Sequence, residues 1–113
     1  MINHVSLNGI LCKVENNSLF RYIKVIRHYK DNKGIFNNDY IPCMMWTKDN
    51  KNELFSYKEG TFVSIDGRLE TIDEKIYVVV EQLTFICNSD ITYKKEENYD
   101  IIIKYIEGDE NNE

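Results

Sequence analysis

The stretch that decides the fold class reads Thr61-Phe62-Val63-Ser64-Ile65-Asp66-Gly67-Arg68-Leu69. Its apolar residues fall at every second position, so an extended chain would carry them on one face and the polar residues on the other. A second stretch, Ile76–Ile86, is rich in β-branched residues, and only the short turn-like segment Glu70–Lys75 separates the two. The pair predicts a β-hairpin formed by Thr61–Leu69 and Ile76–Ile86.

The sequence before this hairpin predicts three more strands. They are expected over Asn3–Val14, Leu19–Tyr29 and Tyr40–Thr47, because each is rich in aliphatic, β-branched or aromatic residues. The turn cluster Glu15–Ser18 separates the first two, and the polar loop Lys30–Asp39 separates the second from the third.

The segment Lys48–Lys58 loses the alternation and predicts a short helix. Asp49 or Asn50 is expected to cap its start, and Gly60 is well placed to end it. The chain is therefore expected to be all-β with one short helix between the third and fourth strands. This is the order of a five-stranded Greek-key OB barrel, and a β-sandwich fragment is the alternative.

Composition excludes several protein classes. The chain has 113 residues, 42% hydrophobic and 29% charged, which fits one globular domain and not a collagen-like or disordered chain. No apolar stretch approaches the roughly 20 residues of a membrane helix, and no signal peptide is visible at Met1–His4. Three widely spaced cysteines argue against a disulfide framework and for a reducing, cytoplasmic setting.

The net charge of −5 is unevenly distributed. Residues 96–113 carry one lysine against seven acidic residues, a sum of −6, whereas residues 1–95 carry 13 basic and 12 acidic residues. Within residues 13–33, six basic residues face two acidic ones, and such a local basic stripe favours a polyanionic partner. We expect a binding domain over residues 1–87 and a polar, acidic extension over 88–113 with a short apolar block at 101–106.

Two aromatic residues of the third predicted strand share a face. Tyr40 and Trp46 have the same parity, opposite to that of Ile41, Cys43 and Met45, which predicts that both rings point away from the core. Nucleic-acid bases stack on exposed rings for roughly 1–3 kcal/mol each. Such rings also fill barrel cores and subunit contacts, and that alternative stays open at this point.

Tyr29 ends the second predicted strand among cations. It shares its parity with Ile23 and Val25, which are expected in the core, so Tyr29 reaches a binding face only if the strand bulges, twists or ends after Val25. Phe36, in the following loop, is expected either to stack a base or to pin the loop. The candidate phosphate contacts are Lys24, Arg27, Lys30, Lys33 and Arg68. For Arg68, a surface ion pair with Asp66 or Glu70 is an equal alternative.

Catalytic and metal chemistry find little support. His4 and His28 fall on different predicted strands, and no cysteine pair has the spacing of a zinc site. Cys43 has the inward parity of a small core residue. We therefore expect no enzyme activity, no metal and no cofactor.

The chain resembles the bacterial single-stranded DNA-binding proteins. Five segments carry the resemblance, in order and with similar gaps, over residues 1–87: Met1–Leu11, Arg27–Asp31, Asp39–Trp46, Lys58–Thr71 and Tyr77–Ile86. The lysine-any-glycine pattern followed by valine-any-isoleucine-any-glycine-arginine-leucine is the most recognisable. The resemblance places stacking aromatics at Tyr29, Tyr40 and Trp46.

The resemblance implies sequence-independent binding of single-stranded DNA by a homo-oligomer, most often a tetramer, otherwise a dimer. The role would lie in DNA replication, recombination, repair or transfer, in the cytoplasm of a bacterium or encoded by a phage or plasmid. The chain lacks the family's glycine-rich linker and proline-phenylalanine tip, so recruitment of replication proteins is not implied. The turn Glu70–Ile76 is also shorter than usual. The alternatives are a primosomal or RNA-binding OB protein and a protein-interaction module without nucleic acid.

Overall fold

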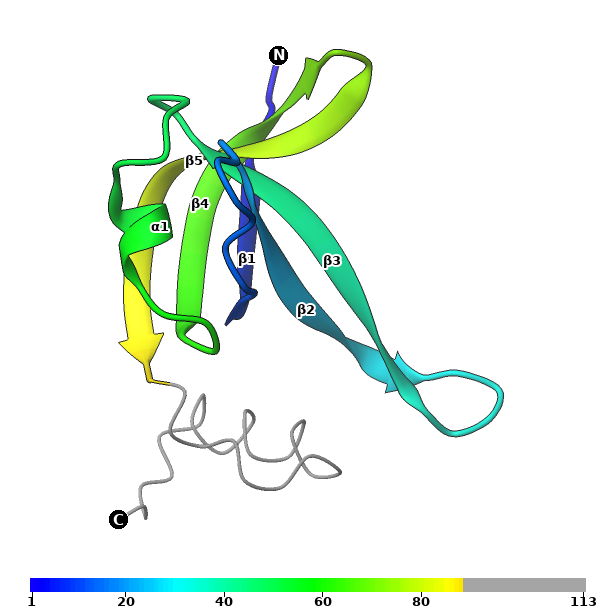
Figure 1. Cartoon of the computed structure of the whole chain (residues 1–113). Helices are drawn as coiled ribbons and strands as arrows, with labels where there is room; N and C mark the ends of the chain where they lie inside the picture. The colour runs from blue at the N-terminus through cyan, green and yellow to red at the C-terminus, as the bar shows by residue number, and fades with distance from the viewer. Residues whose placement is uncertain (89–113) are drawn as a thin grey trace.

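The computed structural model describes residues 1–88, which form a closed five-stranded barrel (Figure 1). The elements in chain order are β1 (Val5–Leu11), β2 (Arg21–Lys30), β3 (Phe36–Met45), α1 (Glu53–Ser56), β4 (Phe62–Ile72) and β5 (Lys75–Cys87). Around the barrel the order is β1-β2-β3-β5-β4, with β3 and β5 parallel and every other neighbouring pair antiparallel. The predicted OB barrel, with its helix between the third and fourth strands, is confirmed. The apolar block at 101–106 lies outside the described residues.

The core follows the alternation read from the sequence. Val63 and Ile65 of β4 are fully buried, as are Cys43 and, almost completely, Met45 of β3. Each buried aliphatic side chain contributes about 1.5–3 kcal/mol relative to an exposed one. Leu54 brings the short helix α1 into the same apolar cluster. None of the helices within residues 1–88 is long and apolar enough to cross a membrane.

Gly67 lies where the backbone of β5 passes close to β4. A Cβ atom there would sit 2.0 Å from the carbonyl oxygen of Val79, inside any real contact distance. The register shifts between Asp66 and Gly67, so the ladder bulges at this point. Gly67 is therefore required by the passage of the β5 backbone.

The first strand is shorter than predicted, Val5–Leu11 and not Asn3–Val14, whereas elsewhere pairing continues beyond the alternating stretches. β4 and β5 pair as far as Ile72 and Lys75, leaving a two-residue turn, Asp73-Glu74, with φ values of 53° and 68°. Positive φ at both central residues is the type I′ geometry that follows the twist of a hairpin. β3 begins at Phe36 and not at Tyr40, since it pairs with β2 through the segment predicted as loop.

The helix cap is also corrected. Asn52, and neither Asp49 nor Asn50, caps α1: its side-chain oxygen accepts a 2.9 Å hydrogen bond from the amide of Leu54. Asp49 instead accepts from the Asn52 side-chain amide at 2.7 Å and holds the cap in place. The helix spans only Glu53–Ser56.

Arg21, which the sequence placed in the basic stripe, is a buried structural residue. Its side chain is 1% exposed and donates hydrogen bonds to the carbonyl oxygens of Cys12 (2.7 Å), Leu54 (2.9 Å) and Tyr57 (2.7 Å). Burial lowers the pKa of Arg21. These bonds tie β2 to the end of β1 and to the residues around α1, so Arg21 is unavailable to a ligand.

Candidate nucleic-acid interface

The β2–β3 hairpin carries two lysine–aromatic pairs on one face. Lys24 lies opposite Tyr40, and Lys30 lies opposite Phe36. Residues opposite each other in a ladder share a face, and the alternation of β3 puts Phe36 and Tyr40 on the same side. Lys24 stands next to the buried Ile23, so this face points away from the core.

Both rings of this face lie beside a cation. The Lys30 ammonium group is 5.5 Å from the centre of the Phe36 ring, and Tyr40 is 57% exposed. We call the set Lys24, Lys30, Phe36 and Tyr40 the hairpin face. Such a face is suited to nucleic acid, because the rings stack on flat bases and the ammonium groups neutralise anionic phosphates.

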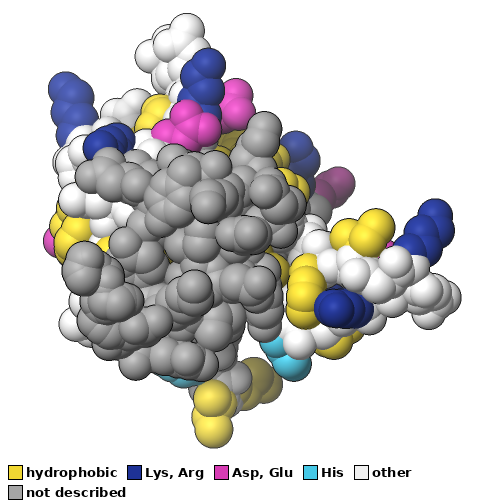
Figure 2. All heavy atoms as spheres, turned by 90° about the horizontal axis from the view of Figure 1, so that it is seen from below, with side chains coloured by type: hydrophobic (Ala, Val, Ile, Leu, Met, Phe, Trp, Pro, Cys, Tyr) yellow, Lys and Arg dark blue, Asp and Glu magenta, His cyan; other side chains and the backbone are white. Residues whose placement is uncertain are grey.

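Lys33 stands at the tip of the same hairpin. The Asp31 carboxylate builds the turn by accepting from the backbone amides of Lys33 (2.8 Å) and Ile35 (2.9 Å), and Gly34 supplies a φ of 78°. Figure 2, seen from below, shows this arm projecting from the barrel with lysine or arginine side chains next to hydrophobic ones. The hairpin therefore places Lys33 within the same projecting, mixed basic and apolar arm.

Tyr29 reaches the surface through the strand irregularity that the sequence required. The β2–β3 register shifts between Ile26 and Lys30, because β2 contributes two more residues than β3 in that interval. Tyr29 is 58% exposed, and its ring stands at 82° to the His28 ring at 5.5 Å. Of the three alternatives that the sequence left open, a bulge, a twist or the end of the strand, the structure shows the bulge.

Tyr29 lies on a different face from Tyr40. It contacts Arg27, whose guanidinium forms a 2.7 Å ion pair with Asp39, and Asp39 has the opposite parity to Tyr40 on β3. Asp39 foremost, and Tyr29 to a lesser degree, raise the pKa of Arg27, while the hydrogen bond from Arg27 lowers the pKa of Asp39. The hairpin thus carries a ring and a cation on each of its two faces.

Trp46 directly follows the C-terminal end of β3. It is six residues from Tyr40, or about 20 Å along an extended strand. Its side chain is 59% exposed, as the parity argument predicted, and its backbone amide donates to the Val80 carbonyl at 2.9 Å, which fixes the residue beside β5. The role of Trp46 in binding stays a prediction.

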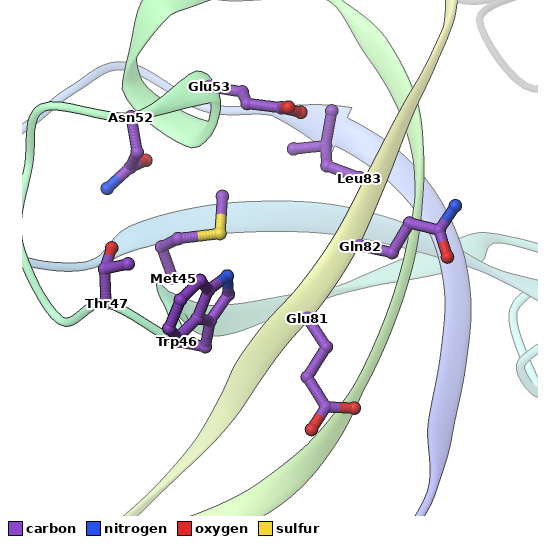
Figure 3. Close-up of a pocket in the computed structure, with 8 residues that line it drawn as sticks. All are labelled: Met45, Trp46, Thr47, Asn52, Glu53, Glu81, Gln82 and Leu83. Carbon is purple, nitrogen blue, oxygen red and sulfur yellow. The ribbon is translucent and has the colours of Figure 1, made fainter.

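A cleft of about 440 Å³ opens beside Trp46 (Figure 3). Residues from the end of β3, from the start of α1 and from β5 line it: Met45, Trp46, Thr47, Asn52, Glu53, Glu81, Gln82 and Leu83. Its two charged side chains are the carboxylates of Glu53 and Glu81. The cleft beside the exposed tryptophan is therefore acidic and is not lined by the basic residues of the stripe.

Arg68 belongs to the Trp46 end of the molecule. Its guanidinium contacts the carboxylates of Glu70 and Glu81, and Lys48 joins the network with a 3.0 Å ion pair to Glu70. The hydrogen bond to Glu70 foremost raises the pKa of Arg68. The ion-pair alternative weighed for Arg68 is therefore what the structure shows, with Glu81 as a partner that only the fold brings near.

The surroundings of the three cysteines disfavour reactive thiolates. Burial raises the pKa of the Cys43 thiol to about 12, and it also raises those of Cys12 and Cys87. Thiols of raised pKa are poor nucleophiles. Among residues 1–88, no group of three or more His, Cys, Asp or Glu side chains is placed to hold a metal ion.

Comparison with known proteins gives the fold. No family model matches the chain, and no curated protein matches its sequence. Among solved structures, the mitochondrial single-stranded DNA-binding protein Rim1 from S. cerevisiae is similar with a TM-score of 0.52 and 10% identity, over 75% of this chain and 93% of that chain. The chain has an OB fold. The expectation drawn from the sequence resemblance is confirmed at this level.

Two further structures are less similar. The dimeric N-terminal domain of PriB from Thermoanaerobacter tencongensis has a TM-score of 0.43 and 19% identity, over 74% of this chain and 96% of that chain. The S. pombe Stn1–Ten1 complex has a TM-score of 0.47 and 9% identity, over 96% of this chain and 71% of that chain.

The structure also adds Phe36 to the candidate stacking residues, a role that the sequence left open. Phe36 becomes part of the hairpin face only once its opposite residue, Lys30, is known. No local signal could have found this pair, because the two-residue shift in β2 sets the register.

Proposed function

We propose that this protein binds single-stranded DNA by base stacking and phosphate neutralisation, without depending on sequence. The observation that carries the proposal is the hairpin face, where Tyr40 and Phe36 each lie opposite a lysine. Bases stack on the rings, and the neighbouring ammonium groups neutralise the phosphates. We propose further stacking contacts at Trp46, beyond the end of β3, and at Tyr29, on the other face of the hairpin. The likeness to Rim1, a protein described as single-stranded DNA-binding, supports the proposal.

The candidate cations fall into two groups. Within residues 1–88, no carboxylate forms an ion pair with Lys24, Lys30 or Lys33, so we assign them the main phosphate contacts. Arg27 uses Nε and Nη2 on Asp39 and also contacts Tyr29, and Arg68 uses both terminal nitrogens on Glu70 and Glu81. We propose secondary phosphate contacts for the two arginines.

We further propose that the protein acts as a homo-oligomer, a tetramer or a dimer. Exposed apolar side chains gather near the N-terminus: Ile2 is 96% exposed, Leu69 44% and Ile76 60%. The Asn3 side chain exchanges two 2.9 Å hydrogen bonds with the backbone of Leu69, which holds the N-terminal segment against β4. Exposed apolar clusters of this kind are typical of subunit contacts.

The proposed role is the protection of DNA during replication, recombination, repair or transfer, in the cytoplasm of a bacterium or for a phage or plasmid. The competing function is a protein-interaction module. The acidic cleft beside Trp46 favours that alternative, because two carboxylates next to a ring suit a basic side chain as well as a base. RNA would use the same hairpin face, and contacts to a 2′-hydroxyl would distinguish it.

Replacement of the Tyr40 ring tests the proposal. Tyr40→Ala should weaken binding of a fluorescein-labelled 16-nucleotide dT oligomer about tenfold, within the range measured for one stacked base. Tyr40→Phe is the matched control and should bind like the wild type, since the ring and not the hydroxyl stacks. Fluorescence anisotropy gives both affinities. Equal affinities for the alanine and phenylalanine variants would refute stacking on Tyr40.

A further inference from the structure

The cleft beside Trp46 has a different chemical character from the hairpin face. Trp46 offers an exposed ring, and Met45 and Leu83 supply apolar lining. Figure 3 shows Asn52 and Glu53 of the α1 region above Met45 and Trp46, Leu83 next to Glu53, and Gln82 and Glu81 of β5 to the right, with Glu81 beside Trp46. A flat ligand that stacks on the indole would therefore present its edge to polar side chains.

Two polar side chains of the cleft, those of Thr47 and Asn52, are already engaged. Asn52 donates to Asp49 and accepts from the Leu54 amide, and the Thr47 hydroxyl hydrogen-bonds to Asp49 at 3.2 Å. These groups hold the loop before α1 and are not available to a ligand.

The groups that remain are mainly hydrogen-bond acceptors. In the part of the chain from 1 to 88, the Glu53 carboxylate and the Gln82 amide have no partner, and Glu81 gives only one of its oxygens to Arg68. An ionised carboxylate accepts and never donates, and its two oxygens can accept a pair of parallel donors. The cleft thus selects for a ligand edge that donates.

The four DNA bases differ in this respect. Guanine presents two adjacent donors, its ring N–H and its 2-amino group, whereas cytosine and adenine each present one amino group. Thymine presents a single N–H between two carbonyl oxygens, which a carboxylate repels. A base stacked on Trp46 is therefore held best when it is guanine and least well when it is thymine.

We propose that the Trp46 cleft is a base-selective subsite, which favours guanine over thymine through the Glu53 carboxylate within an otherwise sequence-independent interface. The proposal rests on the proposed binding of single-stranded DNA. It adds a preference at one stacking position and leaves the hairpin face indifferent to sequence.

Three oligonucleotides of 16 nucleotides test the preference: dT alone, alternating dT–dG, and alternating dT–dI. Hypoxanthine, the base of dI, keeps the ring N–H of guanine and lacks the 2-amino group, so it isolates the second donor. The wild-type protein should bind the dT–dG oligomer about fivefold more tightly than dT, the lower end of what one bidentate base contact gives. The dT–dI oligomer should fall between the two. Anisotropy measures the affinities, and quenching of Trp46 reports occupancy of the cleft.

Glu53→Gln tests the residue. The amide keeps the size of the side chain and replaces one acceptor with a donor. The ratio of the affinity for dT–dG to the affinity for dT should therefore fall toward one, while the affinity for dT is kept or raised. Glu74→Gln is the matched control: it removes the same charge from the exposed turn between β4 and β5 and should keep the fivefold preference.

Each other outcome overturns a different statement. Equal binding of dT and dT–dG by the wild type, or a preference that survives Glu53→Gln, refutes the subsite and leaves single-strand binding intact. Absence of binding to all three oligomers refutes the proposed function itself. Quenching of Trp46 by a tetra-arginine peptide and by none of the oligomers would show that the cleft binds a basic side chain, and would overturn the base-selective subsite.

Discussion

The number of lysines in the β2–β3 hairpin that contact phosphates should determine how strongly DNA affinity depends on salt. Lys24, Lys30 and Lys33 have no carboxylate ion pair within residues 1–88, whereas Arg27 is paired with Asp39 and Arg68 with Glu70 and Glu81. A cation that is already neutralised in the free protein releases fewer counterions from DNA when it binds. The three lysines should therefore dominate the salt dependence.

The expected magnitude follows from this count. Each phosphate neutralised on a single strand contributes about −0.7 to the slope of log K against log salt, so three lysines give a slope of about −2 for each bound protomer. Between 50 and 200 mM salt, that slope corresponds to a loss of affinity of about twentyfold. If both arginines contributed fully, the slope would be about −3.5.

Anisotropy titrations of a labelled dT oligomer at four NaCl concentrations measure the slope. Alanine at Lys24 or Lys30 should reduce its magnitude by about 0.7, while alanine at Lys51, an exposed lysine near α1, should leave it unchanged. Arg68→Ala should change it much less than either hairpin lysine. A slope near zero, or a larger effect for Arg68→Ala than for Lys24→Ala, would refute this reasoning.

Three further changes test other parts of the structure. Arg21→Met should lower the free energy of unfolding in urea by about 3 kcal/mol, because it leaves buried carbonyl oxygens unpaired, and a loss below about 1 kcal/mol would contradict the buried role of Arg21. Glu74→Gly, at a φ of 68°, should raise the melting temperature by about 4–8 °C, the shift that 1 kcal/mol gives in a domain of this size, and an unchanged or lower value would argue against backbone strain there. The lowered pKa of Asp39 means that its contribution to stability is present above about pH 4 and is lost as the pH falls through its lower folded pKa. The melting temperature of the Asp39→Asn variant should therefore fall less between pH 5 and pH 3 than that of the wild type. Equal decreases would show that the ion pair does not contribute to stability.

The sequence predicted the features that depend on local alternation. The strands around Val63 and Cys43, the outward direction of Trp46 and the need for an irregularity before Tyr29 all follow from side-chain parity. Parity is reliable here because the barrel has one buried face, and a slip by one residue would bring the polar set inside.

The features that the sequence could not predict depend on pairing between distant segments. Arg21 looked like its basic neighbours, but the fold brings the carbonyl oxygens of Leu54 and Tyr57 to its guanidinium. Likewise, nothing near Arg68 in sequence indicates that Glu81 will face it. The acidic character of the cleft beside Trp46 has the same origin, because its two carboxylates come from α1 and β5.

The fluorescence of Trp46 during titration with a 16-nucleotide dT oligomer tests the central claim most directly. Trp46 is the only tryptophan of the chain, so the signal has one source. Saturable quenching that weakens from low to high salt is the predicted result, because it places bases against Trp46 and phosphates near the lysines. Unchanged fluorescence, together with no gel shift of the oligomer even at low salt, would contradict the account and favour a protein-interaction module.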